Sequence, residues 1–339
     1  MLKISDIESV VLLSLTIECR DFEYPPLGYR EYLTLERDLR IFGFSGINDL
    51  MRYESTEIIG RLSVAEELVV KAKNRLLEIG VLLKYLDGLA INGIYVITKF
   101  DKGFPSFLKQ KSKDKSSFYL YYSGSLDNLS KGVRLSGLAN MEFEEKELIE
   151  RLIMKIKKEN KSYVSIGEKG IDMAGLELAL KHNVNIVLIA YRDYFRLLDG
   201  YREYVKNKKM IVVSQFEPDS KYDPTNEIVS DGLSSRFCDF RIILSCKPNS
   251  GLTWFNAIQN LTYKWTRIFV VNNRSLGNQK LLAYDYVKLN PADCESEFSF
   301  EYLYEKNRRL CIVDIEEFTQ MSIFDFIPGG NEDEQIVTV

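Results

Sequence analysis

The stretch from Lys161 to Tyr191 combines small, polar and charged residues in a pattern that can bind an anion. An apolar run leads into two glycines, and helical periodicity begins directly after them. The residues that could take part are Ser165, Gly167, Lys169, Gly170 and Asp172. A glycine-containing turn at a helix N-terminus presents backbone N–H groups and the positive end of the helix dipole, which together favour a phosphate. Such turns also occur as purely structural connections, and the residues alone leave both interpretations open.

The residues around this turn predict a β-α-β unit. Residues 163–166 form a short, largely apolar run, and residues 186–189 form a second run that is apolar throughout. Between them, residues 171–180 carry apolar side chains at helical spacing. A run that is apolar on both faces is typical of a buried parallel strand. The turn is therefore predicted to follow the carboxyl end of such a strand.

A second loop with similar chemistry lies between a predicted strand at 240–245 and a predicted helix at 252–265. Its candidate binding residues are Lys247, Ser250, Gly251 and Thr253. In a doubly wound sheet, ligands collect at the edge formed by the carboxyl ends of the strands. We therefore expect both loops at one phosphate-binding edge, where Lys169 and Lys247 add charge. Asp172 is interpreted as a buried, hydrogen-bonded structural carboxylate rather than a general base.

The rest of the chain divides into a helical part and an alternating part. Residues 1–90 show repeated helical periodicity, whereas residues 91–290 alternate between short apolar strands and amphipathic helices, with a predicted loop at 221–235. Repeating β-α alternation is typical of a doubly wound, mostly parallel sheet. The sequence therefore predicts an α/β fold with an N-terminal helical domain (1–90), a central α/β domain (91–290) and a C-terminal extension with an acidic tail (291–339).

Composition disfavours several classes of site. The chain has one histidine, His182, near the end of the predicted central helix, where it is interpreted as a capping residue rather than a catalyst or metal ligand. The five cysteines are scattered and form no C-x-x-C pair, which favours a reducing cytoplasm. No paired carboxylates suggest hydrolysis, and no apolar run reaches the roughly 18 residues of a membrane span. We therefore expect a cytoplasmic, non-enzymatic protein without cofactor, metal or membrane contact.

The charge is unevenly distributed along the chain. The formal net charge is −4, but residues 314–339 contain seven acidic residues and neither lysine nor arginine. Removing these seven negative charges from the total leaves +3 for residues 1–313. Lysines cluster in residues 109–115, 155–161 and 205–209. The sequence therefore predicts a mildly basic body that can accept a phosphate-bearing partner, followed by an acidic tail.

Five short segments stand in a recognisable order. They are ITKFDKGFPSFL (97–108), FYLYYSGSL (118–126), SIGEKGIDMAGLELAL (165–180), KPNSGLTWFNA (247–257) and RIFVVNNRSLGNQKLL (267–282). Their types and order resemble the DNA-processing protein A family (DprA, also called Smf), and the resemblance covers roughly residues 90–290. The family has an extended Rossmann-like core, so the resemblance implies that the doubly wound sheet is Rossmann-like.

The resemblance also implies a function and a set of binding positions. Similar proteins hold single-stranded DNA without catalysis and act as recombination mediators that assist recombinase loading, and a homodimer is expected. The positions that match the family, together with Lys247 and the loop hydroxyls chosen from the residues themselves, give the nucleic-acid or phosphate-binding residues Gly137, Ser165, Gly167, Lys169, Gly170, Lys247, Ser250, Gly251 and Thr253.

The sequence departs from the family at positions that contact DNA. Ala139 stands where the family has an arginine that contacts phosphate, and residues 225–227 lack both arginines of an R-N-R segment. The lost arginines would suit a smaller anion, so one alternative is a Rossmann-like nucleotide-ligand sensor. Another alternative is a scaffold protein of phage defence or a mobile element, which the unmatched residues 1–90 favour.

The acidic tail contains a motif of its own. The segment QMSIF (320–324) resembles the bacterial sliding-clamp-binding peptide Q-x-x-L/I-F. Its residues are Gln320, Ser322, Ile323 and Phe324. In this interpretation Ile323 and Phe324 insert into an apolar groove of the clamp, which adds a sliding clamp to the expected partners. The alternative is a tail that packs on its own domain through the same apolar side chains.

Overall fold

A computed structural model describes residues 7–111, 118–141, 143–284, 286–295 and 297–308. The clamp-like motif at 320–324 lies outside these residues. The chain forms two compact units. The first comprises Met1–Leu126, Tyr191–Lys206 and Ile211–Lys221, and the second comprises Asp127–Ala190, Asn207–Met210 and Tyr222–Val339.

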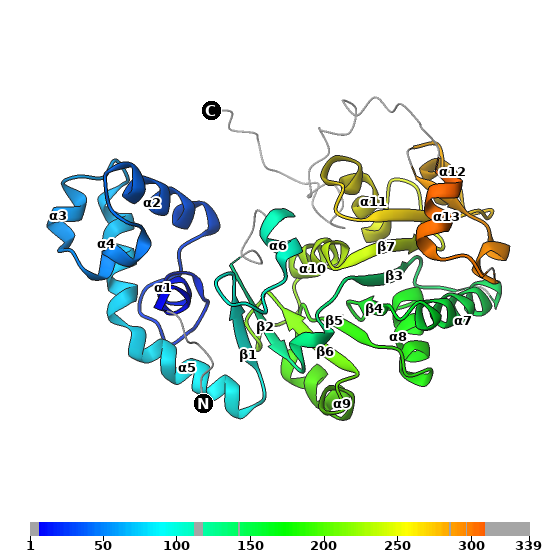
Figure 1. Ribbon diagram of the computed structural model, residues 1–339, viewed down its shortest axis with the longest axis horizontal. Coiled ribbons are helices and arrows are strands. Elements are labelled where there is room, and N and C mark those ends of the chain that lie inside the picture. The colour runs from blue at the N-terminus through cyan, green and yellow to red at the C-terminus, as the bar shows by residue number, and fades with distance from the viewer. Residues whose placement is uncertain (1–6, 112–117, 142, 285, 296, 309–339) are drawn as a thin grey trace, which may run out of the picture. The chain divides into compact units, whose positions relative to one another are not determined.

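The first unit begins with helices, as the sequence predicts for residues 1–90 (Figure 1). These are α1 (Ile7–Thr16), α2 (Tyr29–Ile41), η1 (Ile47–Met51), α3 (Ser55–Ile59), α4 (Glu66–Leu77) and α5 (Ile79–Ile91). The fully buried Arg75 of α4 donates to the carbonyl oxygens of Ser14 at 2.6 Å and Ile17 at 2.8 Å. It therefore satisfies carbonyl groups that the end of α1 leaves without helical partners.

Among its described residues, the first unit also contains three antiparallel strands and two helices. They are β1 (Tyr95–Thr98), α6 (Ser106–Lys111), β2 (Tyr119–Ser123), α9 (Tyr194–Lys206) and β6 (Met210–Ser214), whose first residue belongs to the second unit. Strand β2 pairs with β1 on one side and with β6 on the other. The Tyr194 hydroxyl of α9 donates to the Val212 carbonyl at 2.9 Å, which fixes the helix on the strands.

In the part of the chain that the structure describes, the second unit is built on six parallel strands. In spatial order they are β5 (Ile186–Ile189), β4 (Ser162–Ser165), β3 (Gly132–Ser136), β7 (Cys238–Ile243), β8 (Arg267–Val271) and β9 (Val287–Leu289). Every residue of β3, β4 and β5 is buried, as expected for strands covered on both faces. The predicted mostly parallel α/β sheet is therefore confirmed.

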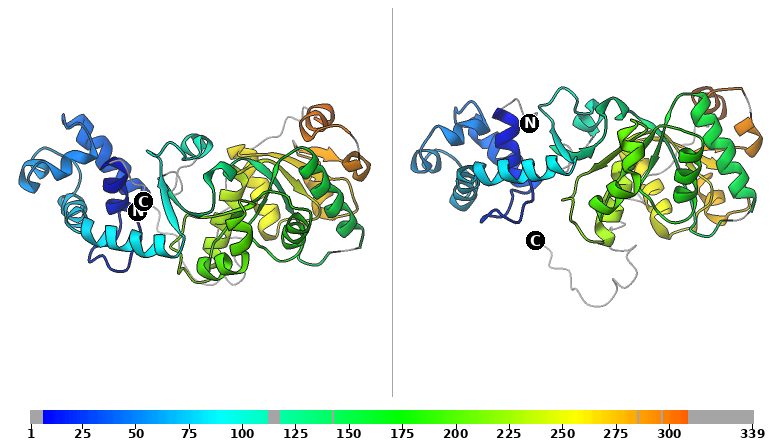
Figure 2. Two further views of the ribbon diagram at one scale, coloured as in Figure 1. Left: turned by 60° about the horizontal axis from the view of Figure 1, so that its bottom comes forward. Right: turned by 90° about the horizontal axis from the view of Figure 1, so that it is seen from below.

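Helices cover both faces of these strands. They are α7 (Phe143–Lys158), α8 (Ile171–Lys181), α10 (Pro224–Arg236), α11 (Gly251–Tyr263), α12 (Leu276–Leu281) and α13 (Phe300–Asn307), with the short η3 (Leu126–Asn128) and η4 (Pro291–Glu295). Helices α7 and α8 lie on one side, and α10 and α11 lie on the other (Figures 1 and 2). From β3 the chain winds outward to β4 and β5, and from β7 it winds the other way to β8 and β9. The winding direction therefore reverses between β3 and β7, which is where doubly wound folds place ligands.

One predicted element is wrong. Residues 221–235 were expected to form a loop, but most of them belong to helix α10. Asp223 caps this helix by accepting a 2.7 Å hydrogen bond from the Thr225 amide, and Pro224 opens the first turn. The helix buries Asp231 and several serines instead of an apolar stripe, so its sequence lacks the usual amphipathic pattern.

Candidate functional site

The loops after β3, β4, β7 and β8 meet at the carboxyl edge of the second unit. They comprise residues 137–141, 166–170, 244–250 and 272–275. Because these four strands are parallel neighbours, the loops that leave them share one edge. All the phosphate-binding positions expected from the sequence belong to these loops or to the residues that flank them.

Two glycines allow the first two loops to pack closely. Gly170 has a φ of +96°, and a Cβ built on it would stand 2.5 Å from both the Leu138 carbonyl oxygen and the Ala139 Cα. A Cβ on Gly137 would stand 2.1 Å from the Ile171 Cδ1. Neither position accommodates a side chain without movement of its neighbours. Gly137 and Gly170 therefore hold the β3 and β4 loops against each other.

Asp172 binds the inner side of the loop that follows β4. Its Oδ2 atom accepts hydrogen bonds from the Ser165 hydroxyl at 2.9 Å and from the Ile166 and Glu168 amides at 3.2 and 2.9 Å. The Gly167 amide donates to the Ser165 hydroxyl at 2.9 Å. The loop therefore uses these three amides and the buried Ser165 hydroxyl internally, in the position that an anion would otherwise occupy.

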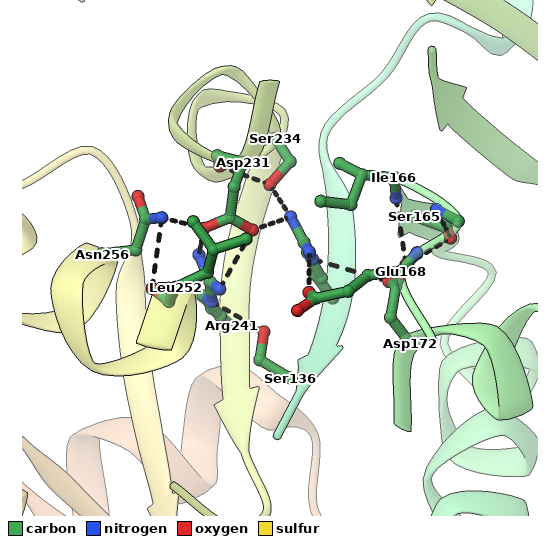
Figure 3. A network of polar contacts seen from close by, with 12 residues as sticks. Ser136, Ser165, Ile166, Glu168, Asp172, Asp231, Ser234, Arg241, Leu252 and Asn256 are labelled. Carbon is green, nitrogen blue, oxygen red and sulfur yellow. Dashed lines mark hydrogen bonds and ion pairs between the residues drawn. The ribbon is translucent and has the colours of Figure 1, made fainter. Parts of the chain in front are cut away.

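A buried charge network lies beneath the loops (Figure 3). Arg134 of β3 is fully buried and forms an ion pair with Asp231 of α10. Its guanidinium also lies 3.6 Å from Asp172 and 3.6 Å from Glu168. Arg241 of β7 binds the same Asp231 through two contacts of 3.1 and 3.2 Å. Two buried arginines from adjacent strands therefore share one carboxylate.

Neutral side chains complete this network. Arg241 donates from Nε to the Ser136 hydroxyl at 2.7 Å and from Nη1 to the Ser235 hydroxyl at 3.1 Å. The Asn256 amide of α11 donates to Asp231, and Figure 3 shows the side chains of Arg241 and Asn256 both reaching Asp231. The network therefore connects β3, β7, α10, α11 and the β4 loop. None of these contacts was expected from the sequence, because the partners are far apart along the chain.

The surroundings of Glu168 change its protonation. Burial raises the pKa of Glu168 to about 8, the negative charge of Asp231 acts in the same direction, and Arg134 opposes it. Burial works against charge on Arg134, but Asp231, Asp172 and Glu168 outweigh it and raise the arginine's pKa. At neutral pH Glu168 is therefore largely protonated, and the two arginines face the carboxyl groups of Asp231 and Asp172.

The loops after β7 and β8 are tied together by amide and hydroxyl groups. The buried Asn278 amide donates to the carbonyl oxygens of Leu244 at 2.8 Å and Val271 at 2.9 Å. The Ser275 hydroxyl donates to the Cys246 carbonyl at 2.9 Å. Because these bonds join the carboxyl ends of two neighbouring strands, they fix the direction in which both loops leave the sheet.

A cavity of about 720 Å³ opens between these loops and the start of α7. Residues of the loops after β3, β7 and β8 line it, including Leu138, Ser245, Lys247 and Arg274. Lys247 is the one expected binding residue in its lining. Ser250 and Gly251 are exposed at the start of α11, Thr253 is buried there, and none of the three lines the cavity.

Three exposed cations stand at this edge. Lys169, Lys247 and Arg274 follow β4, β7 and β8, and none has an ion-pair partner among the residues that the structure describes. The first two were expected from the sequence, whereas Arg274 was missed. The sequence feature that could have identified Arg274 is its position in the segment 267–282, three residues after the end of a buried strand.

Other groups with chemical potential lie elsewhere or have structural partners. His182 ends α8 and contacts Glu150 of α7 at 2.9 Å, so it stands at the opposite end of the helix from the β4 loop. Within the described residues, no group of three or more His, Cys, Asp or Glu side chains is placed to hold a metal. No helix in the described part of the chain is long and apolar enough to span a membrane.

Comparisons with known proteins agree with this architecture. The family model for DNA recombination-mediator protein A matches residues 95–272. The structure of DNA processing protein A from Streptococcus pneumoniae is similar, with a TM-score of 0.62 and 15% identity over 87% of this chain and 97% of that one. A structure of the Helicobacter pylori protein, described by its single-stranded DNA binding mode, has a TM-score of 0.49 and 18% identity over 64% and 97%. No curated protein matches. Because the family model spans slightly more than half of the chain, the protein belongs to the DNA recombination-mediator protein A family.

Proposed function

We propose that this protein binds single-stranded DNA at the edge formed by the loops after β3, β4, β7 and β8. One observation carries the proposal: Lys169, Lys247 and Arg274 are exposed at this edge, without ion-pair partners in the described part of the chain. Single-stranded nucleic acid is held largely by cations that track its phosphates. Three such cations on neighbouring loops provide contacts for the phosphates of a bound strand.

The buried arginines contribute indirectly. Arg134 and Arg241 lie below the surface and are neutralised by Asp231 and its neighbours, so they shape the loops without meeting a phosphate. Binding in this chain therefore depends on a different set of cations from the arginines that it lacks at 139 and 225–227. Affinity should consequently be moderate and strongly dependent on salt.

The DNA-binding role fits a recombination mediator that assists recombinase loading. The H. pylori relative is described as binding single-stranded DNA, which agrees with this role. Non-enzymatic action is part of the proposal, since the one histidine lies away from the edge. The proposal also includes a homodimer in a reducing cytoplasm. It further includes a sliding clamp that binds residues Gln320 to Phe324.

Fluorescence polarisation with a labelled single-stranded oligonucleotide tests the binding proposal. The wild-type protein should bind, and the triple variant Lys169→Ala, Lys247→Ala, Arg274→Ala should bind at least about ten-fold more weakly. The matched control is Lys157→Ala, Lys158→Ala, Lys181→Ala, which removes as many positive charges from the far ends of α7 and α8. Absence of wild-type binding, or equal losses in the two triple variants, contradicts the proposal.

A nucleotide-ligand sensor is the second candidate, and the cavity favours it. Its volume of about 720 Å³ is typical of small-molecule sites, and Lys247 and Arg274 are among its lining residues. A thermal-shift screen against free mononucleotides and dinucleotides separates the two candidates. Stabilisation by a free nucleotide without binding of single-stranded DNA would favour the sensor.

A further inference from the structure

The cavity at the β3, β7 and β8 loops has walls suited to a single nucleobase. Leu138, Leu148, Val271 and Leu276 supply apolar surface, and none of the lining residues that the structure describes is aromatic. A base in this cavity would therefore contact the aliphatic side chains of these four residues. Aliphatic walls exclude water but do not distinguish one base from another, so discrimination falls to the polar groups.

The basic and acidic residues that line the cavity come mostly from different parts of the fold. Lys247 and Arg274 come from the loops after β7 and β8, whereas Glu144, Glu145 and Glu147 come from the first two turns of α7. Arg151 of α7 also lines the cavity, but it is paired with Glu147 and Glu295. Among the described residues, the unpaired cations of the lining therefore come from the loops after β7 and β8, and its carboxylates come from α7. A nucleotide has a matching division, because its phosphate is an anion and the edge of its base carries hydrogen-bond donors and acceptors.

Glu144 is the carboxylate best placed to meet a ligand. It is exposed, and among the described residues it has no ion-pair or hydrogen-bond partner. Glu147, in contrast, lies 3.5 Å from Arg151, whose own second contact is Glu295 at 2.8 Å. An acidic residue in the first turn of a helix also stabilises that helix through the helix dipole. This structural role does not depend on whether the residue lines a cavity.

A carboxylate can only accept hydrogen bonds, and this decides which bases it favours. The exocyclic amino group of cytosine donates, whereas thymine presents a carbonyl oxygen at the corresponding position. We propose, building on the proposed DNA binding, that the cavity receives one base of the bound strand and selects bases with an exocyclic amino group through Glu144. Lys247 and Arg274 contact the adjacent phosphate.

Short oligomers of deoxycytidine and deoxythymidine of equal length test this selection, because the two bases are similar in size. At neutral pH the wild-type protein should bind the deoxycytidine oligomer about ten-fold more tightly, as expected for one hydrogen bond to a charged group. Glu144→Gln should bring the two affinities within about two-fold, since an amide both donates and accepts. Glu177→Gln, an exposed glutamate of α8 outside the cavity, should retain the wild-type preference.

The outcomes separate the two levels of the proposal. If both oligomers bind equally well to the wild-type protein, selection by Glu144 is wrong and DNA binding stands. If a preference for deoxycytidine survives in Glu144→Gln, the preference arises elsewhere and the assignment to this cavity is wrong. If neither oligomer binds, the proposed DNA binding fails, and the selection fails with it.

Discussion

Gly170 lies directly against Leu138, since a Cβ built on the glycine would stand 2.5 Å from the leucine's carbonyl oxygen. The contact joins the loop after β4 to the loop after β3. Lys169 precedes Gly170, and Leu138 lines the cavity that also contains Lys247. The position of the β4 loop is therefore coupled to the wall of the cavity.

Substitution at Gly170 should disturb this packing more than substitution at another glycine of the same loop. Gly170→Ala must tolerate both a φ of +96° and the close approach, and should reduce the free energy of unfolding by about 2 kcal/mol or more. Gly167 has a φ of +71°, but its added Cβ would meet only the Met173 Cε at 3.9 Å. Gly167→Ala should therefore lose about 1 kcal/mol. Equal losses in urea unfolding would show that the close approach is unimportant.

Asp231 should be the most sensitive member of the charge network. Asp231→Asn leaves Arg134 and Arg241 buried without the carboxylate they share, and removing one partner of a buried pair destabilises by about 3–5 kcal/mol. The matched control is Asp239→Asn. Asp239 lies 3.2 Å from Lys161, and both side chains are partly exposed, so this substitution should reduce the free energy of unfolding by about 1 kcal/mol or less. Urea unfolding measures both, and a small loss for Asp231→Asn would contradict the described network.

Glu168 should make stability depend on pH. Its pKa is about 8 in the folded protein against an ordinary value of 4.5, so between these values the folded protein binds a proton that the unfolded chain has released. Stability should therefore fall as pH rises from about 5 to about 8, by at most about 1.4 kcal/mol per pH unit from this residue. Glu168→Gln should flatten the profile, and the exposed Glu177→Gln should not. An unchanged slope in Glu168→Gln would rule out this origin.

Arg75 should be essential to the N-terminal helices. Its guanidinium donates to backbone carbonyl groups of Ser14, Ile17 and Tyr24, the last at 2.5 Å. Arg75→Met leaves buried carbonyl groups unsatisfied, at a cost of about 1–3 kcal/mol for each. The control Arg61→Met removes an exposed pair with Glu57 and should change stability by about 0.5 kcal/mol. Thermal unfolding followed by circular dichroism compares the two variants, and similar melting temperatures would contradict the capping role.

Strand β5 could be predicted because all its residues are apolar, as is typical of a buried parallel strand. The predicted run at 186–189 coincides with β5, and the predicted strand at 240–245 overlaps β7. Helix α10 could not be predicted in the same way, because Asp231, Ser234 and Ser235 turn inward to meet arginines instead of apolar neighbours. A polar buried face removes the periodic signal on which helix prediction depends.

The candidate site could be predicted only in part. The glycines and Lys247 are recognisable from local spacing, because turn geometry depends on neighbouring residues. Arg134 and Asp231 meet only through the sheet, so their contact has no local signal. The internal use of the Ser165 hydroxyl likewise depends on Asp172 folding back from the helix, which spacing does not reveal.

The salt dependence of single-stranded DNA binding tests the central claim most directly. For single strands, each phosphate contact contributes about 0.7 to the slope of log affinity against log salt concentration. Loss of Lys169, Lys247 and Arg274 together should therefore reduce the magnitude of the slope by about 2, and the control triple variant at Lys157, Lys158 and Lys181 should leave it unchanged. A slope that is the same in all three proteins would show that the phosphates are bound elsewhere.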